Sequence, residues 1–353
     1  MVQHYRTHLD LERSLMRSTQ LGDTGISSSV LGFGCSALLG RSGRRESLQA
    51  LAAAWDAGIT FFDTARSYGY GEAEGLLGEF LRGRRDGAVV STKFGILPSP
   101  QRFWKRWAKP MVRGLLSAVP SARGAVRKRA GSELAPGQFT VPVLKQSVHE
   151  SLRQLRTDYV DLLFLHAAPV SVLAQQELLE AMEKLVEAGK VRVAGISAEP
   201  EVIATALQQQ RPLRAVQFPC NVFDLSAAAV IAGSGNQGWV TVANHPFGGV
   251  MRVQQCRDLL RKMAALPQTA AELREKLGEV DDGVLADAVL NLIVQGTGIQ
   301  VVVPAMMKVQ HLARNVEAIR DSRFSPEEIE WLRRTVASKR TGDIVRRSQS
   351  VST

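Results

Sequence analysis

Short apolar runs alternate with amphipathic stretches along most of the chain. The runs are rich in β-prone residues, as expected for strands that are covered on both faces. The stretches between them repeat apolar residues every three or four positions, which predicts helices packed against a sheet. Eight strands are expected, at 30–34, 59–62, 88–92, 159–165, 191–196, 215–218, 239–243 and 300–303.

A helix is expected after each strand. The predicted helices span 45–57, 72–82, 143–155, 173–188, 200–208, 226–233, 283–295 and 309–320. A final helix begins at the capping box Ser325-Pro326-Glu327-Glu328, with proline at its first position, and runs to about 338. A small β-hairpin from Leu21 is expected to lead into the first strand.

Eight strand–helix units in one chain favour an α/β fold of the (β/α)8 TIM barrel type. The alternative is a doubly wound sheet, but Gly32-Phe33-Gly34 at the end of the first strand is followed by Cys35-Ser36-Ala37, which does not complete G-x-G-x-x-G. The expected organisation is an N-terminal extension at 1–18, a barrel at 19–338 and a flexible basic tail at 339–353. Insertions are expected at about 96–140, after the third strand, and at about 246–280.

Composition narrows the class of protein further. The chain has 353 residues, of which 45% are hydrophobic and 22% charged, as in an ordinary globular protein. No run is long enough to span a bilayer, and the N-terminus lacks the apolar core of a signal peptide. The three cysteines are scattered without metal-ligand spacing, which fits a reducing compartment, so a cytoplasmic location is expected.

Polar residues end three neighbouring strands. Asp63, Lys93 and His166 follow the second, third and fourth runs, and Tyr68 lies in the loop after the second. In a barrel of this type, the carboxyl ends of the strands carry the active site. Each of these residues alone is more often structural, but four on one face of three adjacent strands indicate a catalytic set.

Elementary chemistry gives these groups roles. A tyrosine has a pKa of about 10, and a nearby ammonium group such as that of Lys93 would lower it. Asp63 can hold Lys93 charged, and His166 can orient a carbonyl oxygen. This set would protonate a carbonyl, which would still need an electron pair, and a hydride from a reduced nicotinamide is the natural donor.

Three segments also carry a family resemblance. They read Phe-Asp-Thr-Ala-Arg-Ser-Tyr-Gly at 62–69, Ser-Thr-Lys-Phe-Gly at 91–95 and Tyr-Val-Asp-Leu-Leu-Phe-Leu-His at 159–166. Their order and spacing resemble those of the aldo-keto reductases, over most of 20–335. The resemblance implies a barrel that binds NADP(H) across its C-terminal face, with Tyr68 as general acid. The catalytic tetrad that it implies is Asp63, Tyr68, Lys93 and His166.

The same resemblance implies a cofactor site. Its implied members are Ser197 and Gln217 at the nicotinamide carboxamide, Asn244 beside them, and Lys308, His311, Arg314 and Asn315 at the adenosine phosphate. Several positions depart from the family pattern. Ala198 replaces the usual asparagine, Cys220 stands where tyrosine is common, and Ala305, Met306 and Met307 replace residue types that contact phosphate.

The resulting prediction is an NADP(H)-dependent enzyme that interconverts a small carbonyl compound and its alcohol, with NAD(H) as the alternative cofactor. One alternative function is a nicotinamide-binding regulatory subunit with little or no catalysis. Another is an NAD-dependent sugar or alcohol dehydrogenase of the same fold.

A basic segment at 101–130 is unusual for such a barrel. The chain carries a formal net charge of +10, and this segment has nine basic residues, no acidic ones and several interleaved aromatic residues. An active-site lid is one interpretation. The others are a site for an anionic substrate or carrier protein and a membrane-surface helix. Nucleic acid is not expected, because no nucleic-acid-binding module accompanies the segment.

Overall fold

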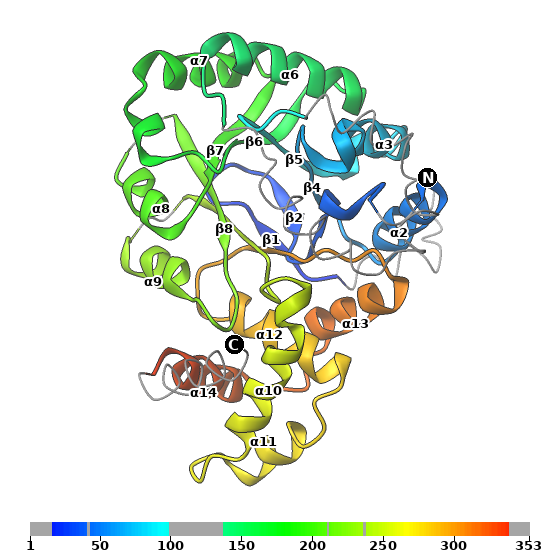
Figure 1. The fold of residues 1–353 in the computed structure, drawn as a ribbon, viewed down its shortest axis with the longest axis vertical. Coiled ribbons are helices and arrows are strands. Elements are labelled where there is room, and N and C mark those ends of the chain that lie inside the picture. The colour runs from blue at the N-terminus through cyan, green and yellow to red at the C-terminus, as the bar shows by residue number, and fades with distance from the viewer. Residues whose placement is uncertain (1–15, 41–42, 99–136, 210–211, 236–237, 339–353) are drawn as a thin grey trace, which may run out of the picture.

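The computed structural model describes residues 16–40, 43–98, 137–209, 212–235 and 238–338. Within them, eight parallel strands form one sheet in the order β10-β9-β8-β7-β6-β5-β4-β3 (Figure 1). The strands are β3 (Gly32–Gly34), β4 (Phe61–Asp63), β5 (Val89–Phe94), β6 (Val160–His166), β7 (Val191–Ser197), β8 (Leu213–Pro219), β9 (Val240–Asn244) and β10 (Val301–Val303). A parallel bridge between Leu31 and Val302 closes the sheet, which confirms the predicted barrel.

Helices surround the sheet, as predicted. They are α2 (Arg44–Asp56), α3 (Ala73–Phe80), α6 (Val141–Leu155), α7 (Gln176–Glu187), α8 (Pro200–Leu207), α9 (Ser226–Gly233), α12 (Asp282–Val294), α13 (Val309–Arg320) and α14 (Pro326–Ala337). The capping box of α14 is present, with Ser325 and Glu328 bonding reciprocally.

The start of β4 differs from its prediction by two residues. The Ile59 amide donates to the Ala54 carbonyl of α2, and the Thr60 amide donates to Ser29 Oγ. The paired register of β4 begins at Phe61, which lies opposite Gly32 of β3 and Val89 of β5. Asp63 is the last residue of β4 and does not interrupt it.

The predicted hairpin closes the N-terminal end of the barrel. Its strands β1 (Ser18–Gln20) and β2 (Ser27–Ser29) pair antiparallel. Leu21 and Ile26, between them, are buried in one cluster with the inward-facing apolar side chains of the strands. That cluster consists of Leu21, Ile26, Phe61, Val89, Leu162, Phe164, Val193, Ala215, Val240, Val242, Val301 and Val303. The barrel interior is therefore a packed core below the polar strand ends.

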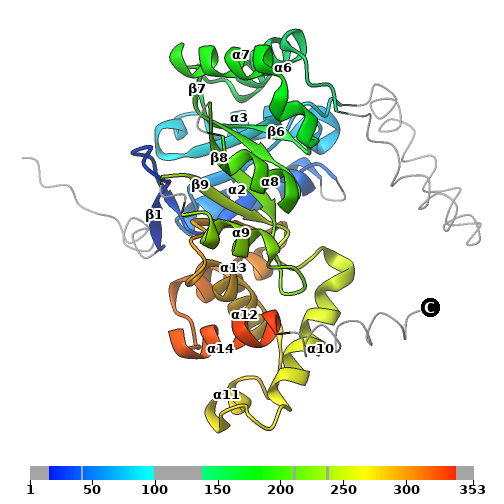
Figure 2. The same cartoon turned by 90° about the vertical axis from the view of Figure 1, so that its left-hand side faces the viewer.

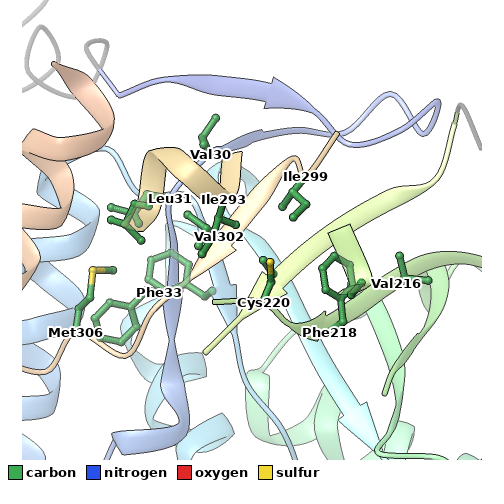
Figure 3. Close-up of a cluster of buried hydrophobic side chains, with 14 of the residues drawn as sticks. Val30, Leu31, Phe33, Val216, Phe218, Cys220, Ile293, Ile299, Val302 and Met306 are labelled. Carbon is green, nitrogen blue, oxygen red and sulfur yellow. The ribbon is translucent and has the colours of Figure 1, made fainter. Parts of the chain in front are cut away.

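A larger apolar cluster lies between the strands and the surrounding helices. Figure 3 shows part of it, with Phe33, Phe218 and Cys220 among the side chains drawn. Successive side chains of a strand point alternately to this outer layer and to the barrel interior. Neighbouring residues at the carboxyl end of a strand therefore lie in different layers.

The insertion expected at about 246–280 contains α10 (Val253–Ala264) and α11 (Ala271–Lys276). Both views place α10 and α11 at the end of the molecule away from α6 and α7 (Figures 1 and 2). The basic segment 101–130, the residues 1–15 of the expected extension and the tail 339–353 lie outside the described residues. In the described part of the chain, no helix combines the length and apolar character needed to cross a bilayer.

Gly195 provides a test of the barrel packing. A Cβ at this position in β7 would lie 2.4 Å from the Ala215 carbonyl oxygen and 2.8 Å from a Phe164 ring carbon. We expect Gly195→Ala to lower the free energy of unfolding in urea by about 1–3 kcal/mol, because the barrel wall must shift. Gly233→Ala in α9 has open space around the new methyl group and should change stability by less than about 1 kcal/mol. Equal effects of the two changes would contradict this account.

Candidate active site

The site is built on a buried ion pair between adjacent strands. Lys93 Nζ on β5 lies 2.8 and 2.7 Å from the two carboxylate oxygens of Asp63 on β4. It also donates to the Thr64 carbonyl at 2.9 Å. Lys93 is 1% exposed and Asp63 4%. A charge buried to this extent is tolerable only when it is paired and hydrogen-bonded, and both conditions are met here.

Three further polar side chains extend this pair across the barrel. Asp63 Oδ1 accepts hydrogen bonds from Ser91 Oγ at 2.6 Å and Gln217 Nε2 at 2.9 Å, and Gln217 Oε1 accepts from Ser197 Oγ at 2.8 Å. Sequence reasoning placed Ser197 and Gln217 in a cofactor site and missed Ser91. Its position two residues before Lys93, on the same face of β5, was the available signal.

Tyr68 lies beside the ion pair, in the short 3-10 helix η2 (Tyr68–Gly71) that follows β4. Lys93 Nζ is 4.9 Å from the centre of its ring. The ring of His166, at the end of β6, is 6.0 Å from that of Tyr68 and nearly perpendicular to it, at 84°. The structure therefore brings together all four residues predicted as the catalytic tetrad.

A second buried charge supports the Tyr68 loop. Glu74 of α3 is 1% exposed, and its carboxylate accepts from Arg66 at 3.0 Å and from Thr92 Oγ1 at 2.6 Å. Arg66 lies in the loop between Asp63 and Tyr68, and Thr92 precedes Lys93 on β5. These bonds connect the loop to the strand that carries the lysine, which holds the tyrosine near it. The sequence did not indicate this contact, because Glu74 lay in a predicted helix and Arg66 in the loop that was considered only for Tyr68.

The pKa of Tyr68 differs from the sequence expectation. Burial raises it above the ordinary tyrosine value, and the charge of Lys93, which opposes this change, is itself offset by Asp63. For Lys93, burial acts to lower the pKa, but Asp63 and Tyr68 outweigh it and the pKa is raised. At neutral pH, Tyr68 therefore carries its proton beside a charged Lys93, as a proton donor requires.

His166 is neutral in this site. Burial, with a contribution from Lys93, lowers its pKa to about 3, and Asp63 acts in the opposite direction. Among the described residues, its buried Nδ1 has no hydrogen-bond partner, and the same holds for Oδ1 of Asn244 at the end of β9. Buried polar atoms without partners are costly, so these two fit the binding of a polar ligand at the carboxyl end of the barrel.

A pocket of about 410 Å³ lies beside α12 and α13. His311, Arg314 and Asn315 line it, whereas Lys308 is exposed and is not among its described lining residues. The full described lining is His245, Pro246, Phe247, Gly249, Val253, Asp282, Leu285, Ala286, Pro304, Ala305, His311, Arg314 and Asn315. It combines apolar walls with a few polar groups, as small-molecule sites do.

The structure also shows where three of the residues that depart from the family pattern lie. Cys220 and Met306 are fully buried in the outer apolar cluster (Figure 3), and neither is among the described residues that line the pocket. Ala305 lines the pocket, where it offers no side-chain hydrogen bond.

Comparison with known proteins identifies the family of the chain. The model of the Aldo/keto reductase family matches residues 30–336. The chain belongs to the aldo-keto reductases. It is 30% identical to the aldo-keto reductase YhdN of Bacillus subtilis over 215 residues, which span 59% of this chain and 55% of YhdN. It is 25% identical to the oxidoreductase YqkF of the same organism over 326 residues, 90% of this chain and 95% of YqkF.

Comparison with solved structures supports the barrel fold. The aldo-keto reductase AKR11C1 of Bacillus halodurans matches with a TM-score of 0.66 at 23% identity, over 92% of this chain and 97% of that one. Proteins of this family generally use nicotinamide dinucleotides.

In this aldo-keto reductase, one carboxylate in the pocket was missed by sequence reasoning. Asp282, at the first residue of α12, forms ion pairs with Arg314 of α13 and Arg257 of α10. The sequence gives Asp281-Asp282 before an apolar run, which reads as a helix cap, and Asp281 does cap α12 through the Val284 amide at 2.7 Å. Nothing local indicates that the second aspartate bridges two distant helices.

The lowered pKa of His166 predicts a pH dependence of stability. The unfolded chain binds a proton at this histidine near pH 6.5, while the folded chain does so only near pH 3, so stability is lost as pH falls through this interval. Between pH 6.5 and about pH 5, we expect the wild type to lose about 2 kcal/mol more than His166→Gln in urea unfolding. His149→Gln, at an exposed position on α6, is the control and should lose as much as the wild type. Parallel pH profiles for the wild type and His166→Gln would refute the assignment.

Proposed function

We propose that this chain transfers a hydride between a nicotinamide dinucleotide and a small carbonyl compound or its alcohol, with Tyr68 as general acid. The observation that carries the proposal is the position of Tyr68. Its ring lies 6.0 Å from the ring of a neutral His166 and 4.9 Å from the ammonium group of a buried, charged Lys93. The membership of this chain in the aldo-keto reductase family supports the reaction class.

The residues of the site have distinct roles in this reaction. When bound, the dinucleotide supplies the hydride that reduces the carbonyl carbon. Tyr68 gives its phenolic proton to the carbonyl oxygen, so that an alcohol leaves and a phenolate remains. The ammonium group of Lys93 stabilises that phenolate, and Asp63 keeps Lys93 charged and in place. His166, which is neutral, orients the carbonyl oxygen through a hydrogen bond.

The dinucleotide would be held at two places. Ser197, Gln217 and Asn244 would hold its nicotinamide end, and the partnerless Oδ1 of Asn244 fits this role. Ser197 and Gln217 bond to each other and to Asp63, so a ligand there also contacts the network that fixes the catalytic ion pair. His311, Arg314 and Asn315 would hold the adenosine end in the pocket of about 410 Å³.

The sequence favours NADP(H) because Lys308 and Arg314 are possible partners of a 2′-phosphate. The alternative is an NAD-dependent sugar or alcohol dehydrogenase of the same fold. The ion pair between Asp282 and Arg314 favours this alternative, because it engages a guanidinium group that a phosphate would need.

Tyr68→Phe tests the proposal. Loss of the phenolic proton should lower kcat by about 10²- to 10⁴-fold in a panel of aldehydes and ketones with NADH and NADPH. Dinucleotide affinity, followed by quenching of tryptophan fluorescence, should stay within about twofold because the pocket is untouched. Tyr70→Phe removes a hydroxyl two residues away and should keep nearly full turnover.

Full turnover by Tyr68→Phe would disprove the acid role. A wild type that binds a dinucleotide tightly but turns over no carbonyl compound would instead support the regulatory-subunit alternative.

A further inference from the structure

The nucleotide pocket contains a carboxylate that engages its arginine. Asp282 lines the pocket together with Arg314, and the two form an ion pair through Oδ2. The other oxygen, Oδ1, pairs with Arg257, whose guanidinium group also donates to the Val280 carbonyl at 2.7 Å. Asp282 therefore ties α10, α12 and α13 together at the edge of the pocket and uses both oxygens to do so.

Among the described residues that line the pocket, no other cation replaces the engaged arginine. Burial, with the charge of Lys308, lowers the pKa of His311 below its ordinary value, so this side chain is neutral at neutral pH. Asp281, which precedes Asp282, is a second carboxylate acted on by the charge of Arg314. Ala305 brings only a methyl group to the lining, and Lys308 is not part of the described lining.

A 2′-phosphate and a 2′-hydroxyl respond differently to such an edge. A phosphate group adds about 1.5 to 2 negative charges at neutral pH, so it is repelled by a nearby carboxylate and must compete with that carboxylate for the guanidinium group. A ribose hydroxyl is neutral and can donate a hydrogen bond to the carboxylate. The same residue thus disfavours one form of the dinucleotide and accommodates the other.

We propose that Asp282 is a specificity-determining residue, which makes this pocket bind NAD(H) in preference to NADP(H). The proposal rests on the proposed function for the placement of the dinucleotide. It reverses the preference for NADP(H) that the sequence suggested. The sequence shows Lys308 and Arg314 as cations, but it does not show that Asp282 pairs with Arg314.

The test measures binding of nucleotide fragments to the full-length protein by calorimetry. The probes are adenosine 5′-monophosphate and adenosine 2′,5′-bisphosphate, which differ by the 2′-phosphate and lack the nicotinamide. The variants are Asp282→Asn, which removes the charge, and Asp282→Glu, which keeps it. Asp258→Asn is the matched control, because Asp258 also lies in this region, on α10, but pairs with Arg261 at 3.2 Å and does not line the pocket.

The wild type should bind the monophosphate at least about tenfold more tightly than the bisphosphate. Asp282→Asn should strengthen bisphosphate binding by about tenfold or more and change monophosphate binding by less than about threefold. Asp282→Glu and Asp258→Asn should both keep the wild-type preference.

A wild type that prefers the bisphosphate overturns the proposal, whatever the variants do. So does an equal gain in bisphosphate affinity for Asp282→Asn and Asp258→Asn, because that gain would reflect net charge alone. Failure of both fragments to bind would overturn the placement of the adenosine end. None of these outcomes depends on hydride transfer, so they are distinct from a failure of the Tyr68→Phe test.

Discussion

The ion pair of Lys93 and Asp63 is the interaction on which the catalytic end of the barrel depends. An ammonium group that is 1% exposed would be costly to keep charged without a partner, and removing either member of such a pair costs about 3–5 kcal/mol. The pair also fixes its surroundings, because Asp63 collects hydrogen bonds from β5 and β8 as well. The chemistry proposed for Tyr68 follows from this arrangement, since the phenol meets a lysine that is charged and immobile.

The barrel makes this arrangement possible by separating apolar and polar layers. Leu21, Ile26 and the inward-facing strand residues form an apolar interior, and the polar set lies above it at the carboxyl ends. Because neighbouring strands are in register, Asp63 lies opposite Ser91, and Ser197 opposite both His166 and Gln217. Side chains from four strands can therefore form one network without any of them leaving its strand.

The sequence predicted the barrel and the tetrad because both leave local signals. Buried strands read as apolar runs, and a polar residue at the end of such a run stands out, as Asp63 and Lys93 do. Contacts between distant segments leave no such signal. Gln217 and Asp63 are 154 positions apart, and the ion pairs of Asp282 join three helices. The pKa of Tyr68 was misjudged for a related reason, because the sequence names the nearby cation but not the burial that opposes it.

The two ends of the proposed dinucleotide site show that the effect of a cation depends on its partner. At the tetrad, Asp63 holds Lys93 charged, and the ring of Tyr68, the proposed proton donor, lies 4.9 Å from the ammonium group. In the pocket beside α12 and α13, Asp282 engages Arg314, and we propose that this pair disfavours a phosphate. In the proposed function, one carboxylate thus sustains catalysis and another selects against a ligand. The second arrangement depends on the packing of α10, α12 and α13, because Asp282 forms ion pairs with both outer helices.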